Sequence, residues 1–273
     1  MIQCQKTRPD PNADPNAGAI LTIAGTDPSG GAGIQRDIKT FRDFGLNGLS
    51  VITALTAQNQ KKVKAVLPVP SAFVLKQIKT LLEEHDIDVI KLGMLARAGI
   101  VAGLAQLFTK TKFKKIVIDP IVISSSGYPL LDKKGISVLK KHLLPLTTIV
   151  TPNLHEAAIL ADMEEVSTVE EMKEVAKKIK RLGPLYVLVK GGHLKEVRSQ
   201  KSGVRRKNEK AIDILYDGRE FKIFEAKRIA KDVHGTGCIL SSAIAAGLAK
   251  GLDMEDAVKK AKIYTTRIIS CAS

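Results

Sequence analysis

Short runs of hydrophobic residues alternate along the chain with segments in which hydrophobic positions recur every three or four residues. A nearly continuous hydrophobic run predicts a strand buried on both faces, and the longer period predicts an amphipathic helix. The runs place strands at residues 20–24, 49–53, 89–92, 115–119, 148–151 and 186–189. The helical period is found at residues 33–44, 71–84, 100–109, 133–142, 154–161 and 169–181. This alternation predicts a three-layer α/β/α sandwich with a mostly parallel central sheet.

The last third of the chain completes this pattern. Residues 212–216 and 220–224, separated by Asp217-Gly218, predict a β-hairpin, and two closing helices are expected at 237–250 and 254–269. No internal repeat and no break in composition divides the chain, so we expect one domain over residues 19–273. The Pro/Asn/Asp-rich residues 1–18 predict a flexible N-terminal tail.

A basic segment, LKEVRSQKSGVRRKNEK at residues 194–210, interrupts the strand and helix pattern and is expected to be a structureless insertion. One interpretation is an exposed loop. The other is a flap that brings cations to a phosphate site, because the segment follows one of the candidate motifs described below.

The net charge of +15 raises the possibility of a nucleic-acid partner. Lysines alternate with glutamates along residues 170–181, which is typical of a solvated, ion-paired helix face. Aromatic residues make up only 4% of the chain and tryptophan is absent, so few side chains are available to stack on bases. These features predict no nucleic-acid partner, and a basic surface also suits phosphorylated small molecules.

No apolar run approaches the ~20 residues that a membrane helix needs, and the N-terminus carries no apolar signal-peptide core. We therefore expect no membrane association and a cytoplasmic location. The three cysteines, Cys4, Cys238 and Cys271, form neither a CxxC pair nor a metal-ligand spacing.

The segment DVHGTGC, residues 232–238, precedes a helix of small apolar residues. A Gly-Thr-Gly turn at a helix start presents unpaired backbone N–H groups beside the positive end of the helix dipole, where they bind anions. The same place is expected to lower the pKa of the Cys238 thiol, and a thiolate can accept a proton from a hydroxyl group. The alternative is structural: Thr236 caps the helix and Cys238 is a buried residue without a chemical role.

Further candidates stand at the ends of predicted strands, where open α/β sheets bind ligands. The loop GTDPSGGAG, residues 25–33, holds four glycines in nine residues, and no P-loop sequence GxxxxGK[ST] occurs. Asp119, the pair Asn153 and Glu156, and Lys190 in the segment KGGH follow later strands. Oxygen ligands suit Mg²⁺ and a lysine suits phosphate, so these residues predict a Mg²⁺–nucleotide site with Asp119 and Glu156 as metal ligands.

Six segments together resemble the hydroxymethylpyrimidine/phosphomethylpyrimidine kinases of thiamine biosynthesis, a branch of the ribokinase-like superfamily. They are ILTIAGTDPSGGAGIQRDIKTF, VITALTAQNQ, KLGML, TPNLHEA, LVKGGH and HGTGC, in the family's order, and they extend over about residues 19–270. Many sugar kinases of the superfamily carry Asp at the position of Cys238, whereas Cys is typical of the pyrimidine and pyridoxal branch. The resemblance implies the three-layer fold, a small-molecule kinase activity, and ATP and Mg²⁺ as cofactors.

Carried over by motif, the resemblance assigns roles to single residues. Gly25, Gln58, Met94 and Ile121 line the pyrimidine pocket, where Gln58 offers both a donor and an acceptor to an aminopyrimidine edge. Asn153, Glu156 and Lys190 serve the nucleotide and Mg²⁺. Gly235, Thr236 and Gly237 form the anion hole around the proton acceptor Cys238. The family phosphorylates the hydroxymethyl group and then adds a second phosphate, a step that needs no base because a phosphate oxygen attacks.

This sequence departs from the family's pattern at two places. The family usually continues into a Gly-rich tail with a final Pro and His near the nucleotide, whereas this chain stops at Ser273. We therefore expect a truncated chain or one part of a longer fusion protein, and the missing tail bears on adenine recognition. Ile121 stands where Val is frequent, which changes the pocket volume slightly.

Two other functions compete with this interpretation. A pyridoxal or pyridoxine kinase of the same branch acts on a hydroxymethyl group of a similar ring, but Gln58 and Met94 favour the pyrimidine. A non-enzymatic pyrimidine sensor or nucleic-acid-binding protein would fit the charge of +15, but HGTGC and KGGH argue against it. The superfamily is often oligomeric, so a homodimer is expected.

Overall fold

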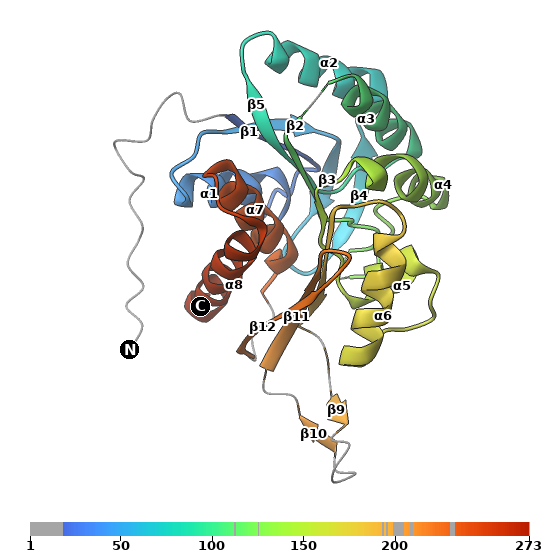
Figure 1. The fold of residues 1–273 in the computed structure, drawn as a ribbon. Helices are drawn as coiled ribbons and strands as arrows, with labels where there is room; N and C mark the ends of the chain where they lie inside the picture. The colour runs from blue at the N-terminus through green and yellow to red at the C-terminus, as the bar shows by residue number, and fades with distance from the viewer. Residues whose placement is uncertain are drawn as a thin grey trace.

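The computed structural model describes residues 19–272 apart from 112, 125, 193, 195, 199–204, 208–209 and 230–232. Its centre is one eight-stranded sheet in the order β12-β11-β8-β7-β6-β5-β1-β2 (Figure 1). The strands are β1 (Ala19–Ala24), β2 (Gly48–Ile52), β5 (Ile87–Leu92), β6 (Lys115–Ile118), β7 (Ile149–Val150), β8 (Tyr186–Gly191), β11 (Lys210–Tyr216) and β12 (Phe221–Lys227).

Six neighbouring strands, from β8 to β2, run parallel to one another. Strands β11 and β12 form an antiparallel hairpin, and β11 also pairs antiparallel with β8. The carboxyl ends of the parallel strands therefore lie along one edge of the sheet, which is where this class of sheet places ligands.

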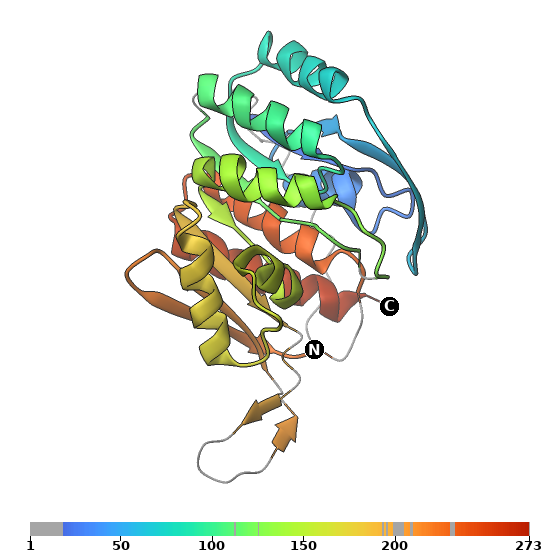
Figure 2. The ribbon, with the colours of Figure 1, turned by 90° about the vertical axis from the view of Figure 1, so that its right-hand side faces the viewer.

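Helices cover both faces of the sheet, as Figures 1 and 2 show from two sides. One face carries α1 (Gly33–Asp43), α7 (Thr236–Ala249) and α8 (Met254–Cys271), and the other carries α2 (Ser71–Leu82), α3 (Ala98–Lys110), α4 (Lys133–Val138), α5 (Leu154–Ala161) and α6 (Val169–Lys180). Alternate residues of a strand enter the two cores: Ile20 packs on the α7 side and Leu21 on the α3 side. These buried strands have the nearly continuous hydrophobic composition expected of parallel sheets.

Helix α7 lies deepest, because residues 238–248 are all buried. It packs on α1 and α8 and on the sheet. Its small residues permit this close approach, so Cys238 in the first turn is buried, whereas Thr236 and Gly237 before it remain partly exposed. The burial of Cys238 controls the pKa of its thiol.

The structure confirms the three-layer α/β/α fold and corrects three details. The predicted strands and helices are all present, with ends that shift by a few residues. The predicted helix at 133–142 ends as α4 at Val138 and continues as a π-helix over Leu139–Leu143. The segment 194–210 is not structureless, because β9 (Glu196–Arg198) pairs with β10 (Arg205–Lys207) in a small ribbon that projects from the sheet (Figures 1 and 2).

The hairpin of β3 (Ala54–Gln58) and β4 (Val63–Pro68) was not predicted from the sequence. Strands β3 and β4 pair outside the main sheet, directly after β2. The hydrophobic run of β2 continues into β3 without a turn signal, so periodicity alone does not divide the two. The hairpin brings Gln58 to the edge of the sheet where the candidate site lies.

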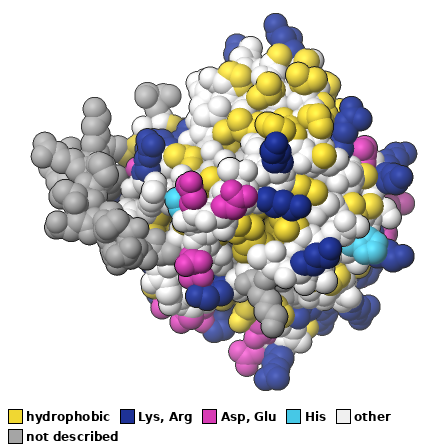
Figure 3. Space-filling view, turned by 90° about the horizontal axis from the view of Figure 1, so that it is seen from above, with side chains coloured by type: hydrophobic (Ala, Val, Ile, Leu, Met, Phe, Trp, Pro, Cys, Tyr) yellow, Lys and Arg dark blue, Asp and Glu magenta, His cyan; other side chains and the backbone are white. Residues whose placement is uncertain are grey.

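On the face seen in Figure 3, Lys and Arg side chains lie among acidic and hydrophobic ones rather than in one basic patch. Among the described residues, no helix has the length and apolar character needed to cross a membrane.

Candidate active site

The candidate residues gather at the carboxyl edge of the sheet, around the start of α7. Lys190 Nζ on β8 donates to Asp119 Oδ1, just after β6, at 2.7 Å. A Cβ added to Gly237 on α7 would stand 3.1 Å from Lys190 Nζ and 3.4 Å from Asp119 Oδ2. An acid, a cation and the open amide end of a helix thus meet at one point, as the sequence predicted.

Asn153 and Glu156 join this group at the start of α5. They form a reciprocal capping box, in which Asn153 Oδ1 accepts from the Glu156 amide at 2.9 Å and Glu156 Oε2 accepts from the Asn153 amide at 2.8 Å. Both residues therefore have a structural role in addition to any nucleotide contact. Burial and the nearby charge of Asp119 raise the pKa of Glu156 to about 7, although Lys190 opposes the rise.

This donor set fits a Mg²⁺ ion. The described residues hold no group of three or more His, Cys, Asp or Glu side chains that would bind a metal without other ligands. Mg²⁺ usually takes one or two carboxylates and completes its shell with phosphate oxygens and water. Asp119 and Glu156 supply two buried carboxylates against one cation, Lys190, so a further positive charge is favourable there.

Cys238 is the third residue of α7 and is only 6% exposed. The backbone N–H of Gly33, at the start of α1, faces the sulfur and acts to lower the pKa of the thiol. The expectation of a lowered thiol pKa is wrong: burial raises the pKa of Cys238 to about 11, Lys91 opposes the rise, and Asp119 and Asp37 add to it. Removal from water outweighs the helix dipole here, because a charged sulfur loses most of its hydration. The structural alternative for Thr236 does not hold either, since Gly235 is the N-cap residue and no side chain caps this helix.

The residues expected to line a substrate pocket also come together. A Cβ added to Gly25 would stand 3.1 Å from Met94 Sδ, and Ile121 packs on the same small cluster as Met94. Gln58 reaches across from β3, and its Nε2 lies 2.9 Å from His234 Nε2. The hairpin, the loop after β5 and the HGTGC segment thus border one region.

Two residues that the sequence interpretation did not assign connect these loops. His234 Nε2 lies 3.1 Å from Asp27 Oδ2, and Asp27 is buried. The carboxylate of Asp27 also accepts from the amides of Ser29 and Ala32, at 2.9 and 2.8 Å, which fixes the glycine-rich loop. Both residues stand inside motifs noted from the sequence, but only the fold shows that they meet. Two further motif residues, His193 and Asp232, fall outside the described residues.

The HGTGC segment docks on the glycine-rich loop through Gly235. Gly235 adopts φ +84°, and a Cβ there would lie 1.9 Å from the carbonyl oxygen of Gly31, which no side chain tolerates. A glycine is therefore required for two reasons, conformation and close approach.

Gly235→Ala is expected to abolish most catalytic activity and to lower the thermal midpoint, because the two loops must separate. Gly251→Ala is the matched control: Gly251 has φ +81° but nothing lies within 4 Å of its added Cβ. The control carries only the conformational cost of about 1–2 kcal/mol. Thermal melts and turnover assays on both variants check this, and equal losses would show that the docking contact is unimportant.

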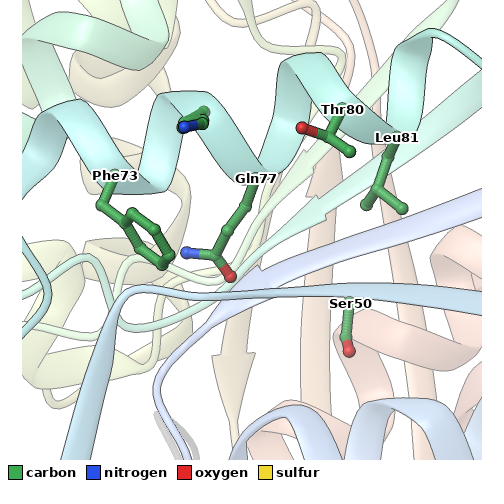
Figure 4. Close-up of a pocket in the computed structure, with 6 residues that line it drawn as sticks. Ser50, Phe73, Gln77, Thr80 and Leu81 are labelled. Atoms are coloured by element: carbon green, nitrogen blue, oxygen red, sulfur yellow. The ribbon is translucent and has the colours of Figure 1, made fainter.

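Two cavities on the described part of the chain lie elsewhere. One, of about 330 Å³, lies between β2 and α2, where Phe73 and Gln77 extend from the helix and Ser50 from the strand (Figure 4). Gln77 bonds both backbone groups of Ile52 at 3.2 Å and so covers part of the sheet edge. The other, of about 360 Å³, lies beside Phe44 and Tyr264. Neither includes a residue of the candidate site.

The fold and the site together define a class of kinase in which a glycine-framed helix start and the strand ends replace the P-loop, the ribokinase-like class. Within that class, the sequence profile described as phosphomethylpyrimidine kinase matches residues 27–273. The chain belongs to the phosphomethylpyrimidine kinase family.

Known proteins of this family are similar over most of the chain. The hydroxymethylpyrimidine/phosphomethylpyrimidine kinase of Aquifex aeolicus is 42% identical over 91% of this chain and 93% of its own length. A crystal structure of phosphomethylpyrimidine kinase from Clostridium difficile has a TM-score of 0.78 and 40% identity, covering 92% of this chain and 99% of that one. An ADP complex of Bacillus subtilis pyridoxal kinase has a TM-score of 0.80 and 36% identity, covering 91% and 90%.

Other relatives are longer proteins. The chain spans 50% of a thiamine biosynthesis bifunctional protein of Geobacter sulfurreducens and 45% of a bifunctional enzyme of Arabidopsis thaliana. The chain thus spans about half the length of these bifunctional relatives and nearly the full length of the Aquifex aeolicus kinase.

Proposed function

We propose that the chain phosphorylates 4-amino-5-hydroxymethyl-2-methylpyrimidine and then its monophosphate, with ATP as donor and Mg²⁺ as cofactor, in thiamine biosynthesis. The observation that carries the proposal is the position of Cys238. It lies between the Gly33 amide and the charges of Asp119 and Lys91. The residue before it on α7, Gly237, borders Lys190. His234, four residues earlier, contacts Gln58 at the pocket.

The first phosphorylation then follows from these positions. The hydroxymethyl oxygen forms a bond to the γ-phosphorus of ATP, the bond to the ADP oxygen breaks, and the hydroxyl proton passes to the Cys238 sulfur. Backbone amides at Gly235, Thr236 and Gly237 donate to the oxygens of the transferred group, where the helix start favours negative charge. In the second phosphorylation a phosphate oxygen attacks, so no proton acceptor is needed and positioning supplies the catalysis.

Asn153, Glu156 and Lys190 are proposed to bind the nucleotide, and Asp119 and Glu156 to hold Mg²⁺. When bound, the ion offsets the charge of the ATP phosphates. Lys190 remains protonated at neutral pH: burial works against its charge, but Asp119 and Glu156 raise its pKa overall. A permanent cation therefore faces the phosphate site from β8.

Rising pH is expected to accelerate the first phosphorylation. With a pKa of about 11, only about one Cys238 thiol in ten thousand is ionised at pH 7 in the free protein. Because kcat/KM reports the ionisation of the free enzyme, it should rise about tenfold per pH unit between pH 8 and 10. The second phosphorylation needs no base and serves as the reference at each pH. Parallel pH profiles for the two steps would contradict the assignment of Cys238.

Pyridoxal kinase activity is the second candidate, because the pyridoxal kinase of Bacillus subtilis shares the fold at 36% identity. Both substrates present a hydroxymethyl group on a six-membered heteroaromatic ring. Gln58 and Met94 border the pocket and favour the pyrimidine, whose ring edge both donates and accepts hydrogen bonds. Product analysis by mass spectrometry with each alcohol, ATP and Mg²⁺ decides the matter. Faster phosphorylation of pyridoxal would reverse the assignment.

The remaining parts of the proposal concern the chain as a whole. We propose one kinase domain over residues 19–273, a cytoplasmic location where ATP is available, and no nucleic-acid or membrane partner. We also propose a homodimer that uses the β3–β4 hairpin, because Leu55 and Leu67 are cross-strand partners and are 47% and 67% exposed. Phe73 on the neighbouring α2 is 56% exposed. Light scattering of the purified protein, compared with a Leu55→Ser/Leu67→Ser variant, tests the dimer; a monomeric parent would refute it.

A further inference from the structure

A fully buried ion pair lies beneath the candidate site and has no part in the chemistry described above. Lys91 Nζ on β5 donates to both carboxylate oxygens of Asp37 on α1, at 2.9 and 2.8 Å. Neither side chain has exposed surface. Thr22 on β1 and Ser242 on α7 donate to the same carboxylate, at 2.6 and 2.7 Å. Asp37 is thereby bonded to three other elements at once.

Stability alone is a weak reason for such a pair. Moving two charges out of water costs several kcal/mol per ion, and well-packed neutral residues often serve the fold as well. A lysine with no water contact in the middle of a hydrophobic strand therefore calls for another explanation. Lys91 belongs to the motif KLGML, in which Met94 borders the candidate pocket.

The pair connects directly to the helix turn that carries Cys238. On α7, Ser242 follows Cys238 by four residues, so the two residues lie on the same face of that helix. On α1, Asp37 follows Gly33 by four residues and lies on the same face as Gly33. The Gly33 amide faces Cys238 at one turn, and at the next turn Ser242 donates to Asp37, so the two helices are joined directly beside Cys238. The ammonium of Lys91 lies near the floor of the site, because a Cβ added to Gly93 would stand 3.0 Å from it.

The charges around Cys238 come from every element packed on it. Burial raises its pKa most; Lys91 opposes this, while Asp119 and Asp37 raise the pKa further and the Gly33 N–H lowers it. Lys190 also interacts electrostatically with Cys238. Lys91 is the charge that favours the thiolate most strongly, and the effect is mutual, since Cys238 is among the groups that raise the pKa of Lys91 against its burial.

We propose that Lys91 is a positioning residue for the first phosphorylation: through Asp37 it holds α7 against α1, and it places a buried positive charge beneath the helix turn that carries Cys238. The inference rests on the proposed role of Cys238 as proton acceptor. Lys91 itself touches no substrate; it acts by increasing the fraction of thiolate at neutral pH and by fixing its position.

The test uses Lys91→Met and the charge-neutral pair variant Lys91→Met/Asp37→Asn. The single variant leaves Asp37 buried without its cation and is expected to lose stability. The pair variant removes both charges and should recover most of the thermal midpoint. If the role of Lys91 is structural only, kcat for the first phosphorylation recovers with it. If the charge acts on Cys238, kcat stays about tenfold lower, with KM for the pyrimidine unchanged.

A second readout does not depend on kinase activity. Alkylation of Cys238 by iodoacetamide, measured on its peptide by mass spectrometry across a pH series, reports the thiol pKa. In the pair variant that pKa should rise by about one unit, because the loss of Lys91 outweighs the loss of Asp37. An unchanged alkylation profile would overturn the inference, even if the chain proved to have a different substrate. A shifted profile without any pyrimidine kinase activity would refute the proposed function and leave the electrostatic role of Lys91 standing.

Lys262 and Asp213 provide the matched control. They form another buried ion pair, at 2.6 Å, between α8 and β11. Lys262→Met/Asp213→Asn removes the same two kinds of charge from a place that is not among the groups acting on Cys238. Its alkylation profile should match that of the parent protein. A shift as large as that of the Lys91 variant would mean that any buried pair has this effect, which contradicts the proposal.

Discussion

Replacing Cys238 by alanine is expected to lower kcat for the first phosphorylation by about 10²–10⁴-fold, the usual contribution of a positioned proton acceptor. The sulfur is buried at the start of α7, and Cys238 is the only free cysteine among the described residues, so no other described thiol can take its place. The KM for the pyrimidine should change little, because the pocket contacts of Gln58 and Met94 are left intact. Steady-state kinetics with the pyrimidine alcohol give both numbers.

The same variant contains its own control. The second phosphorylation uses a phosphate oxygen that carries no proton at neutral pH, so Cys238→Ala should convert the monophosphate at nearly the parent rate. Losses of equal size in both steps would mean that the substitution disturbs the anion-binding turn rather than removing a base. Full activity in the first step would eliminate the role of Cys238 altogether.

Lys190→Met should lower both phosphorylations by about 10²–10³-fold and weaken ATP binding, because it removes a preorganised cation from the site of the transferred phosphate. Lys190 Nζ lies 2.7 Å from Asp119 and beside Gly237, so its charge acts on both steps alike. The variant should still fold: Glu156, with a pKa of about 7, takes up a proton when the lysine charge is lost. Turnover of each substrate and calorimetric ATP binding measure the effect.

Lys115→Met is the matched control for this change. Lys115 begins strand β6, which is separated from β8 by β7, and it lies at the opposite edge of the sheet, where its Nζ donates to the Leu248 carbonyl at 3.0 Å. The control should retain normal turnover of both substrates. If Lys190→Met kept activity within threefold of the parent, the phosphate site proposed here would be in the wrong place.

Much of the fold could be predicted because it rests on local patterns. Hydrophobic runs fix the strands, the helical period fixes the covering helices, and their alternation leaves one layered architecture. The β3–β4 hairpin escaped this reasoning because β2 runs into β3 without a turn residue. The ribbon of β9 and β10 escaped it because its composition is that of a loop, and each residue pairs with a partner seven to eleven positions away.

The candidate site divides in the same way. Asp119, Asn153, Glu156 and Lys190 were placed together correctly, because parallel strands deliver their ends to one edge. The capping box of Asn153 and Glu156 is visible only in the structure, because strand-end position does not show which backbone groups their side chains bond. His234 and Asp27 were overlooked as partners, since they are far apart in the sequence and meet only when two loops dock.

The sequence by itself determined the order of elements and the glycine-rich turns at the ligand edge, because both depend on near neighbours along the chain. The tertiary structure alone decided the ionisation of Cys238 and the environment of Lys91. Burial and through-space charge control both, and neither can be read from spacing. The helix start favours a thiolate, but the packing of α7 among α1, α8 and the sheet removes water from the sulfur and raises its pKa to about 11.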